Sequence, residues 1–214
     1  MLPEKFTERM KPLLDEEWER FAAAMDEDAV RGVRINRIKI DPQIYRNGYD
    51  ERLEPISYYR DGFYFCSNDP VGVLAEHHAG IFYMQDPGAM ASLAAIDIPQ
   101  GAKVLDMCAA PGGKSTQLKN KLGEKGVLVS NEIISSRCKI LTGNIERLGL
   151  KNTVTTCTDT GKLAKIFPDT FDLIMVDAPC SGEGMFRKED IAIEEWSPEN
   201  VRKCAERQKE ILEN

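Results

Sequence analysis

Hydrophobic positions follow two different patterns in the first part of the chain. Over residues 3–29, apolar residues recur every three or four positions, which predicts helix with one buried face. Over residues 31–40, apolar residues alternate with charged or polar ones, which predicts a strand whose basic side faces water. This strand is either an ordinary solvated strand or one whose basic groups track RNA phosphates. With the turns and aromatic residues that follow, we expect a small α+β N-terminal module over residues 1–80, with RNA contact in the second case.

The chain then alternates helix and strand. A helix of small residues is expected at 88–95, and a turn at 99–101 leads into the next strand. The expected strands lie at 104–106, 127–132, 152–157 and 171–177, and the expected helices end at 122 and 148. Strands separated by helices indicate right-handed βαβ units and a doubly wound α/β sheet. The apolar run at 171–177 is typical of a parallel strand that is buried on both faces.

Composition narrows the class of protein. The 214 residues are 42% hydrophobic and 29% charged, as in a soluble globular protein, and the net charge is −7. That charge argues against unspecific nucleic-acid binding, although not against a local basic groove. No apolar run approaches the ~20 residues of a membrane span, and the N-terminus lacks a signal-peptide pattern. We therefore expect a cytoplasmic protein without membrane contact.

Cysteines and histidines do not form a metal-binding pattern. The six cysteines include no C-x-x-C pair, and the two histidines, His77 and His78, are adjacent. A zinc site is therefore not expected. Scattered thiols fit a reducing compartment. Four of them are expected to be small buried hydrophobic residues: Cys66, Cys138, Cys157 and Cys204.

The strongest candidate for chemistry is the turn after the strand at 104–106. Gly112 and Gly113 lack a Cβ, so that the backbone can approach a ligand closely, and the N–H groups of a helix start follow them. This is a nucleotide-type site at the carboxyl end of a first parallel strand. A P-loop NTPase is disfavoured, because its motif requires glycine where Cys108 stands. The G-x-G-x-x-G fingerprint is also absent.

Acidic residues follow the next strands at the same edge of the expected sheet. Glu132 lies 19 residues after Gly113, where a carboxylate can accept the ribose hydroxyls of a nucleotide, or it is a helix-start acid. Asp159 follows the third strand and could meet an adenine, or it is a loop acid. The fourth strand runs into Asp177 and Cys180, a carboxylate and a thiol where substrates bind in open α/β sheets.

Two long motifs carry a family resemblance. Residues 106–114 (DMCAAPGGK) and 177–182 (DAPCSG) resemble the Nol/Nop/Sun family of RNA cytosine-5 methyltransferases. Residues 31–36, 183–188 and 196–198 resemble its bacterial RsmF-like branch, which modifies ribosomal RNA. The resemblance implies a Rossmann-like S-adenosylmethionine-dependent methyltransferase domain over residues 81–214. Glu132 would then hold the ribose of S-adenosylmethionine, and Asp159 its adenine. The methionine end would lie against Cys108, Ala109, Ala110, Pro111, Gly112, Gly113 and Lys114, with Asp177 nearby.

The resemblance also implies how cytosine is attacked. In the family, a cysteine of a later Thr-Cys motif adds to the base, while the counterpart of Cys180 assists release and that of Asp177 contacts the base. The sequence ends at Asn214, directly after the helix expected at 198–213, without a fifth strand or that motif. Thr156-Cys157 ends the third strand and is not accepted as the nucleophile. We expect an N-terminal fragment that binds cofactor without methyl transfer; the alternative is a non-catalytic S-adenosylmethionine- or RNA-binding module. An exposed edge at the fourth strand would favour self-association.

Overall fold

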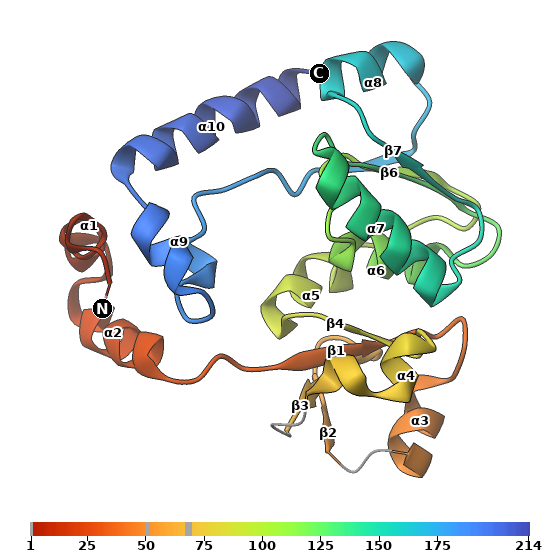
Figure 1. Cartoon of the computed structure of the whole chain (residues 1–214), viewed down its shortest axis with the longest axis horizontal. Helices are drawn as coiled ribbons and strands as arrows, with labels where there is room; N and C mark the ends of the chain where they lie inside the picture. Colours follow the sequence, from red (N-terminus) through yellow and green to blue (C-terminus); the bar gives the residue numbers. More distant parts are fainter. Residues whose placement is uncertain (1, 50–51, 67–69) are drawn as a thin grey trace. The chain divides into compact units, whose positions relative to one another are not determined.

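The computed structural model describes residues 2–49, 52–66 and 70–214, and the chain forms two compact units (Figure 1). One unit is Val30–Asp177, and the other combines Met1–Ala29 with Ala178–Asn214. The first unit contains both sheets, whereas the second is helical. The expected domain boundary after residue 80 stays a prediction.

The first sheet is antiparallel, in the order β2-β3-β1-β4 (Figure 1). Its strands are β1 (Gly32–Ile35), β2 (Leu53–Pro55), β3 (Gly62–Phe65) and β4 (Phe82–Met84). The helical segments that lie between these strands in the sequence are α3 (Pro42–Tyr49), η2 (Val71–Val73) and α4 (Ala75–His78). Val33, Ile35 and Phe63 are at most 1% exposed and form the centre of its core. Strand β4, just beyond residue 80, pairs with β1 and so belongs to this sheet.

The strand expected over residues 31–40 is wrong in its extent and its exposure. Only β1 is strand, and all four of its residues are buried, because it lies between β3 and β4 and is covered on both faces. Arg34 is 0% exposed. Arg37 follows the strand and pairs with Asp61, 2.7 Å between Nη2 and Oδ1. The basic row is therefore interrupted at Arg34, and RNA contact by the N-terminal module stays a prediction.

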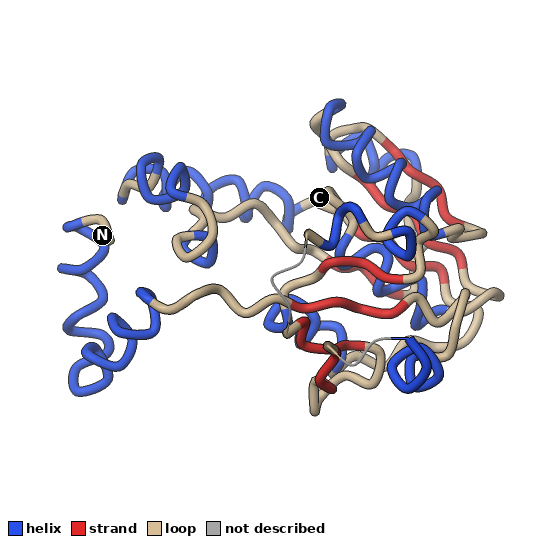
Figure 2. The backbone as a smooth tube through the Cα atoms, turned by 60° about the horizontal axis from the view of Figure 1, so that its bottom comes forward, coloured by secondary structure: helices blue, strands red, loops and turns tan. Residues whose placement is uncertain are grey.

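The second sheet is parallel, in the order β7-β6-β5-β8, which confirms the expected α/β, Rossmann-like architecture (Figure 2). Its strands are β5 (Lys103–Asp106), β6 (Val127–Asn131), β7 (Thr153–Thr156) and β8 (Leu173–Met175). The helices of this unit are α5 (Pro87–Ala94), α6 (Gly113–Leu122), α7 (Ser135–Leu148) and α8 (Thr160–Ile166). Leu118 and Leu122 of α6 pack on Val104 and Leu128 of the sheet. This packing fixes where α6 begins above the end of β5.

Strand β8 differs from the buried strand that its apolar run predicts. It pairs with β5 on one side and ends the order of the sheet in the described part of the chain. As a result, Ile174 is 51% exposed. The edge was expected, but self-association through it stays a prediction.

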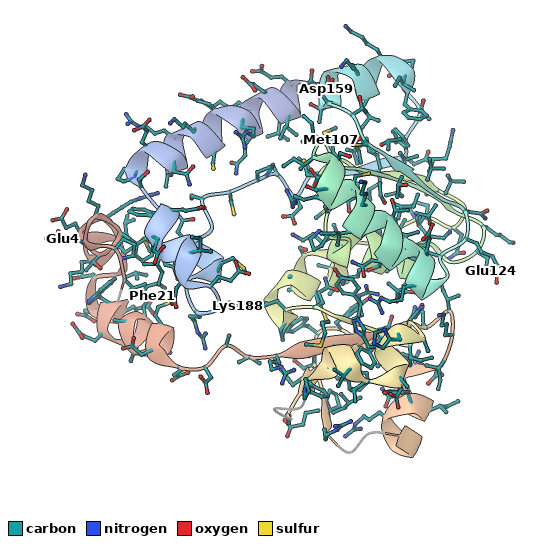
Figure 3. All side chains as sticks on the ribbon, viewed as in Figure 1. Glu4, Phe21, Met107, Glu124, Asp159 and Lys188 are labelled. Carbon is teal, nitrogen blue, oxygen red and sulfur yellow. The ribbon has the colours of Figure 1, made fainter. Side chains whose placement is uncertain are left out.

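The helical unit has a small aromatic core. It contains α1 (Glu4–Leu14), η1 (Asp15–Glu17), α2 (Trp18–Asp26), η3 (Glu183–Met185), α9 (Asp190–Glu195) and α10 (Pro198–Glu213). The ring of Phe6 lies 5.2 Å from Phe186 and 5.5 Å from Trp196, centroid to centroid, and Phe21 (labelled in Figure 3) lies 6.3 Å away. The helices expected at 3–29 and 198–213 are therefore present, the first of them broken at η1. Among the described residues, no helix is long and apolar enough to cross a membrane.

Two isoleucines of the expected strand provide a test of β1. Ile35 is 0% exposed and Ile38 is 41% exposed. We expect Ile35→Ala to lower the free energy of unfolding by about 2–5 kcal/mol, because it opens a cavity in the core. Ile38→Ala should lower it by under about 1 kcal/mol. Urea unfolding measures both, and similar losses in the two variants would contradict the burial of β1.

Candidate functional site

The candidate site is built around the turn that joins β5 to α6. Gly112 is the N-cap of α6 and has a φ of +116°, in the left-handed region that favours glycine. The turn is held from both neighbouring strands: the Met107 N–H donates to the Met175 carbonyl, and the Ala109 N–H donates to the Asn131 carbonyl. Figure 3 labels Met107 at the start of this turn. The backbone of the turn is thereby fixed at the carboxyl edge of the sheet.

A second set of contacts reaches the turn from α7. The Asn144 side-chain amide donates to the Pro111 carbonyl at 2.9 Å, and Arg137 donates to the Ala110 carbonyl at 2.9 Å. Ala109 and Ala110 are buried against Leu141 of the same helix. The turn is therefore clamped between β5, its neighbours and α7, so that a ligand would meet a preformed backbone.

Asp106, the last residue of β5, has a buried carboxyl group. Its Oδ2 accepts a hydrogen bond from the Ser115 hydroxyl at 2.6 Å, and the Ser115 and Ser130 hydroxyls lie 2.9 Å apart. Its Oδ1 is buried without a hydrogen-bond partner. Burial raises the pKa of Asp106 to about 6, with a smaller increase from Asp177, while the Ser115 hydrogen bond opposes the increase. A buried acceptor without a partner is unusual in a folded protein.

Negative charge surrounds the first half of the turn. The pKa of the Cys108 thiol is raised to about 11, most by burial and further by the carboxylates of Asp106, Glu132 and Asp177. Cys108 therefore stays a thiol at neutral pH, which argues against a role as nucleophile. The same three carboxylates give the site a potential that favours a cation.

Lys114 and Asp177 form an ion pair across the site. The Lys114 Nζ lies 2.5 Å from the Asp177 Oδ2, joining the first turn of α6 to the chain just after β8. The Asp177 side chain is 52% exposed, so that it remains accessible to a second partner. The structure thus brings these two expected site residues together.

Glu132 lies at the end of β6, and its side chain is 5% exposed. Its Oε1 accepts the Ile134 N–H at 2.9 Å, and its Oε2 lies 3.5 Å from Nη1 of Arg137. Glu132 thus bonds to Ile134, the residue that precedes α7, and does not lie in the first turn of the helix. Each carboxylate oxygen can accept more than one hydrogen bond, so that these contacts leave Glu132 able to accept a ribose hydroxyl. The ribose contact itself stays a prediction.

Arg137 is the site residue that the sequence reasoning missed. It links the Ala110 carbonyl of the turn to the Glu132 carboxylate. A cation in the first turn of a helix opposes the helix dipole, so that its presence in α7 was a signal that it has specific partners.

Asp159 and Cys180 are placed differently from the residues above. Asp159 caps α8: its Oδ1 accepts the Lys162 N–H at 2.9 Å, and this hydrogen bond, more than the nearby ammonium, lowers its pKa (Figure 3). The structure thus gives Asp159 a capping role, and its contact with adenine stays a prediction. Cys180 is exposed and belongs to the helical unit, so that its assignment also stays a prediction. Across residues 2–49, 52–66 and 70–214, no group of three His, Cys, Asp or Glu could hold a metal ion.

The buried carboxyl of Asp106 predicts a pH dependence of stability. The folded chain holds this proton with a pKa of about 6, whereas an unfolded aspartate has a pKa of about 3.9. The protonated group therefore stabilises the fold fully below about pH 4, and the contribution is lost as the pH rises through about 6. We expect the free energy of unfolding of the wild type, relative to Asp106→Asn, to fall by about 3 kcal/mol over this range.

Urea unfolding of both proteins at about pH 4 and pH 7 measures this difference. The exposed Glu124→Gln is the control and should not change with pH in this way. An equal difference at the two pH values would contradict the burial of an ionisable Asp106.

Comparison with known proteins covers nearly the whole chain. Residues 93–214 match the family described as 16S rRNA methyltransferase RsmB/F, and residues 2–87 match the N-terminal domain of 16S rRNA methyltransferase RsmF. The ribosomal RNA small subunit methyltransferase F of Serratia proteamaculans is 37% identical over 223 residues, covering 100% of this chain and 47% of the relative. That of Erwinia tasmaniensis is 35% identical, covering 98% and 46%. The chain thus spans about half the length of these curated relatives.

Solved structures of methyltransferases share the fold of this chain. A methyltransferase homolog protein from Pyrococcus horikoshii is 26% identical, with a TM-score of 0.81, covering 99% of this chain and 68% of that one. NSun6 from the same organism, solved with SFG, has a TM-score of 0.84 at 18% identity, covering 98% and 78%, and supports the fold alone. The resemblance drawn from the motifs is therefore confirmed, together with S-adenosylmethionine as the cofactor of the family. The chain belongs to the RsmB/F family of 16S rRNA methyltransferases.

Proposed function

We propose that this chain forms the cofactor-binding part of an enzyme that transfers a methyl group from S-adenosylmethionine to carbon 5 of cytosine in ribosomal RNA. The observation that supports the proposal most strongly is the turn from Cys108 to Lys114, whose backbone is fixed by side chains of α7 and whose thiol feels the charge of three carboxylates. S-adenosylmethionine supplies a methyl group on a cationic sulfonium. A rigid backbone cradle with negative potential suits that cation.

The residues of the turn fit this cofactor in shape as well as in charge. A Cβ on Gly112 would lie 3.2 Å from Cδ1 of Leu141 and would require φ in the left-handed region, so that the turn tolerates no larger residue without moving. The first N–H groups of α6 lack helix partners and can donate to a ligand carboxylate. We assign the methionine end of the cofactor to this turn and its ribose to Glu132.

For cytosine methylation, we assign roles to Asp177 and Cys180. A cysteine thiolate that adds to carbon 6 of the base makes carbon 5 nucleophilic; after carbon 5 has taken the methyl group, a base removes its proton and the thiolate leaves. Asp177 would contact the ring of the base, since its carboxylate is half exposed beside Lys114. Cys180 is exposed and lies three residues after Asp177, and we assign it to proton handling during release rather than to first attack.

The attacking cysteine is not assigned to Cys108 or Cys157. The high pKa of Cys108 keeps it protonated. Cys157 follows β7, at the opposite edge of the sheet from β8, three strand spacings or roughly 14 Å away from the chain that leads to Asp177. We therefore propose that residues 1–214 alone bind cofactor without completing methyl transfer. The second candidate function is a binding module without turnover, which is favoured because neither Cys108 nor Cys157 is assigned as the attacking cysteine.

The cofactor site predicts two losses of affinity. Gly112→Val should abolish binding of S-adenosylhomocysteine, because its side chain strains the turn that must face the ligand. Glu132→Ala should weaken binding by about 1–3 kcal/mol, the effect of losing a hydrogen bond to a charged group. Titration calorimetry measures both variants against Glu124→Ala. Glu124 (labelled in Figure 3) lies in the turn between α6 and β6, at the amino ends of the strands, whereas the candidate site lies at their carboxyl ends. Wild-type affinity in Gly112→Val would overturn the assignment of the turn.

The assignment of Cys180 predicts which reaction step fails. In the whole enzyme, Cys180→Ala should accumulate a covalent complex with RNA, because addition proceeds while release does not. Residues 1–214 alone should form no adduct with RNA that carries 5-fluorocytosine. Denaturing gels separate the adduct from the free protein. An adduct formed by residues 1–214 and lost in Cys180→Ala would instead make Cys180 the nucleophile.

A further inference from the structure

We infer that Arg34 is a positioning residue for the cofactor turn: its buried guanidinium, which comes from the N-terminal sheet, holds the first turn of α6 in the shape that binds the ligand. The inference rests on the proposed cofactor role of this turn. It assigns a function to the basic position in β1 that the fold removes from solvent.

The guanidinium of Arg34 contacts α6 through both of its terminal nitrogens. Nη1 donates to the Thr116 carbonyl at 3.4 Å, and Nη2 donates to the Gly113 carbonyl at 3.4 Å and to the Thr116 hydroxyl. These partners lie 79 and 82 residues further along the chain, in the same compact unit. The side chain thereby joins the first sheet to the helix that begins at the candidate site.

A relay carries the effect of Arg34 to the backbone nearest the ligand. Because the Thr116 hydroxyl accepts from Arg34, its own hydrogen is free to point toward the Gly112 carbonyl, to which it donates at 2.7 Å. Gly112 is the left-handed residue that starts α6. Loss of the guanidinium would release the orientation of this hydroxyl and weaken its hold on the Gly112 carbonyl, which would keep only the hydrogen bond from the Thr116 N–H at 2.9 Å.

The position of Arg34 is itself fixed from behind. Its Nε donates to Oε1 of Gln85 at 2.8 Å, and Nε2 of Gln85 donates to Oε1 of Gln117 at 2.8 Å. Gln117 in turn donates to the Met90 carbonyl at 2.9 Å. These side chains are all buried, so that they form a polar network within an otherwise apolar interface between β1, β4, α5 and α6. A fully connected network of this kind specifies one arrangement of its members.

Burying the charged guanidinium of Arg34 in this interface costs desolvation free energy. Burial lowers the pKa of Arg34, and the charges of Tyr59, Tyr83 and Asp61 oppose this decrease. The hydrogen-bond partners of the guanidinium are carbonyl, amide and hydroxyl oxygens rather than a carboxylate. Apolar residues often replace buried charges without loss of stability, which makes a role beyond stability the better explanation here. Lysine cannot reproduce the role, because a single ammonium lacks the planar fork that reaches both carbonyls and the hydroxyl.

The test compares S-adenosylhomocysteine binding in Arg34→Lys, Thr116→Val and the double variant, measured by calorimetry at a temperature where each is folded. We expect Arg34→Lys and Thr116→Val each to weaken binding about tenfold, with little further loss in the double variant, because both break one relay. Thr116→Ser keeps the hydroxyl and should restore wild-type affinity. Ile35→Ala is the matched control: it destabilises the same strand and should leave the affinity of the folded protein unchanged.

Each outcome decides between the claims. Wild-type affinity in Arg34→Lys, or an equal loss in Ile35→Ala, would overturn the positioning role while leaving the cofactor site intact. Should Arg34→Lys fail to fold, then Thr116→Val and Thr116→Ser decide alone, and equal affinity in these two would contradict the relay. A wild-type protein that binds no S-adenosylhomocysteine would overturn the proposed function, and this inference with it.

Discussion

The structure depends on one constraint: the turn between β5 and α6 must hold a left-handed residue, Gly112, while leaving the first N–H groups of α6 for a ligand. Three successive carbonyls of the turn are held by side chains. Arg137 holds that of Ala110, Asn144 that of Pro111, and Thr116 that of Gly112. The parallel sheet supplies the platform, and α7 and the first sheet supply the supports. This explains why two sheets of different kinds pack into one compact unit.

Charge is arranged around the same turn. The charges of three carboxylates act on Cys108 in this turn, and one of the three is buried at the end of β5 with an unpartnered oxygen. Lys114 pairs with Asp177 and Arg137 with Glu132, which balances part of this charge. A site that is polar, fixed in shape and negative in potential before any ligand arrives does not need to reorganise when a cation binds. This preorganisation is the physical link between the family to which the chain belongs and the chemistry proposed for it.

The sequence was sufficient where the signals are local. Glycines in the turn, the helix ending at Gly149 and the alternation of strand and helix each follow from backbone preferences within a few residues. Burial was not predictable in the same way. The alternating pattern around Arg34 is the same whether the polar side meets water or buried carbonyls 79 residues away. An apolar run such as that of β8 likewise does not report which neighbours a strand has.

Mapping S-adenosylmethionine binding by backbone amide chemical shifts in residues 1–214 tests the central claim most directly. The account predicts that the largest changes fall on residues 108–114 and 132–134, with smaller changes after β7 and β8. Changes in α6 should fade beyond its first two turns. Shifts concentrated in the first sheet or in the helical unit, or no shifts at saturating ligand, would contradict the assignment of the turn as the cofactor site.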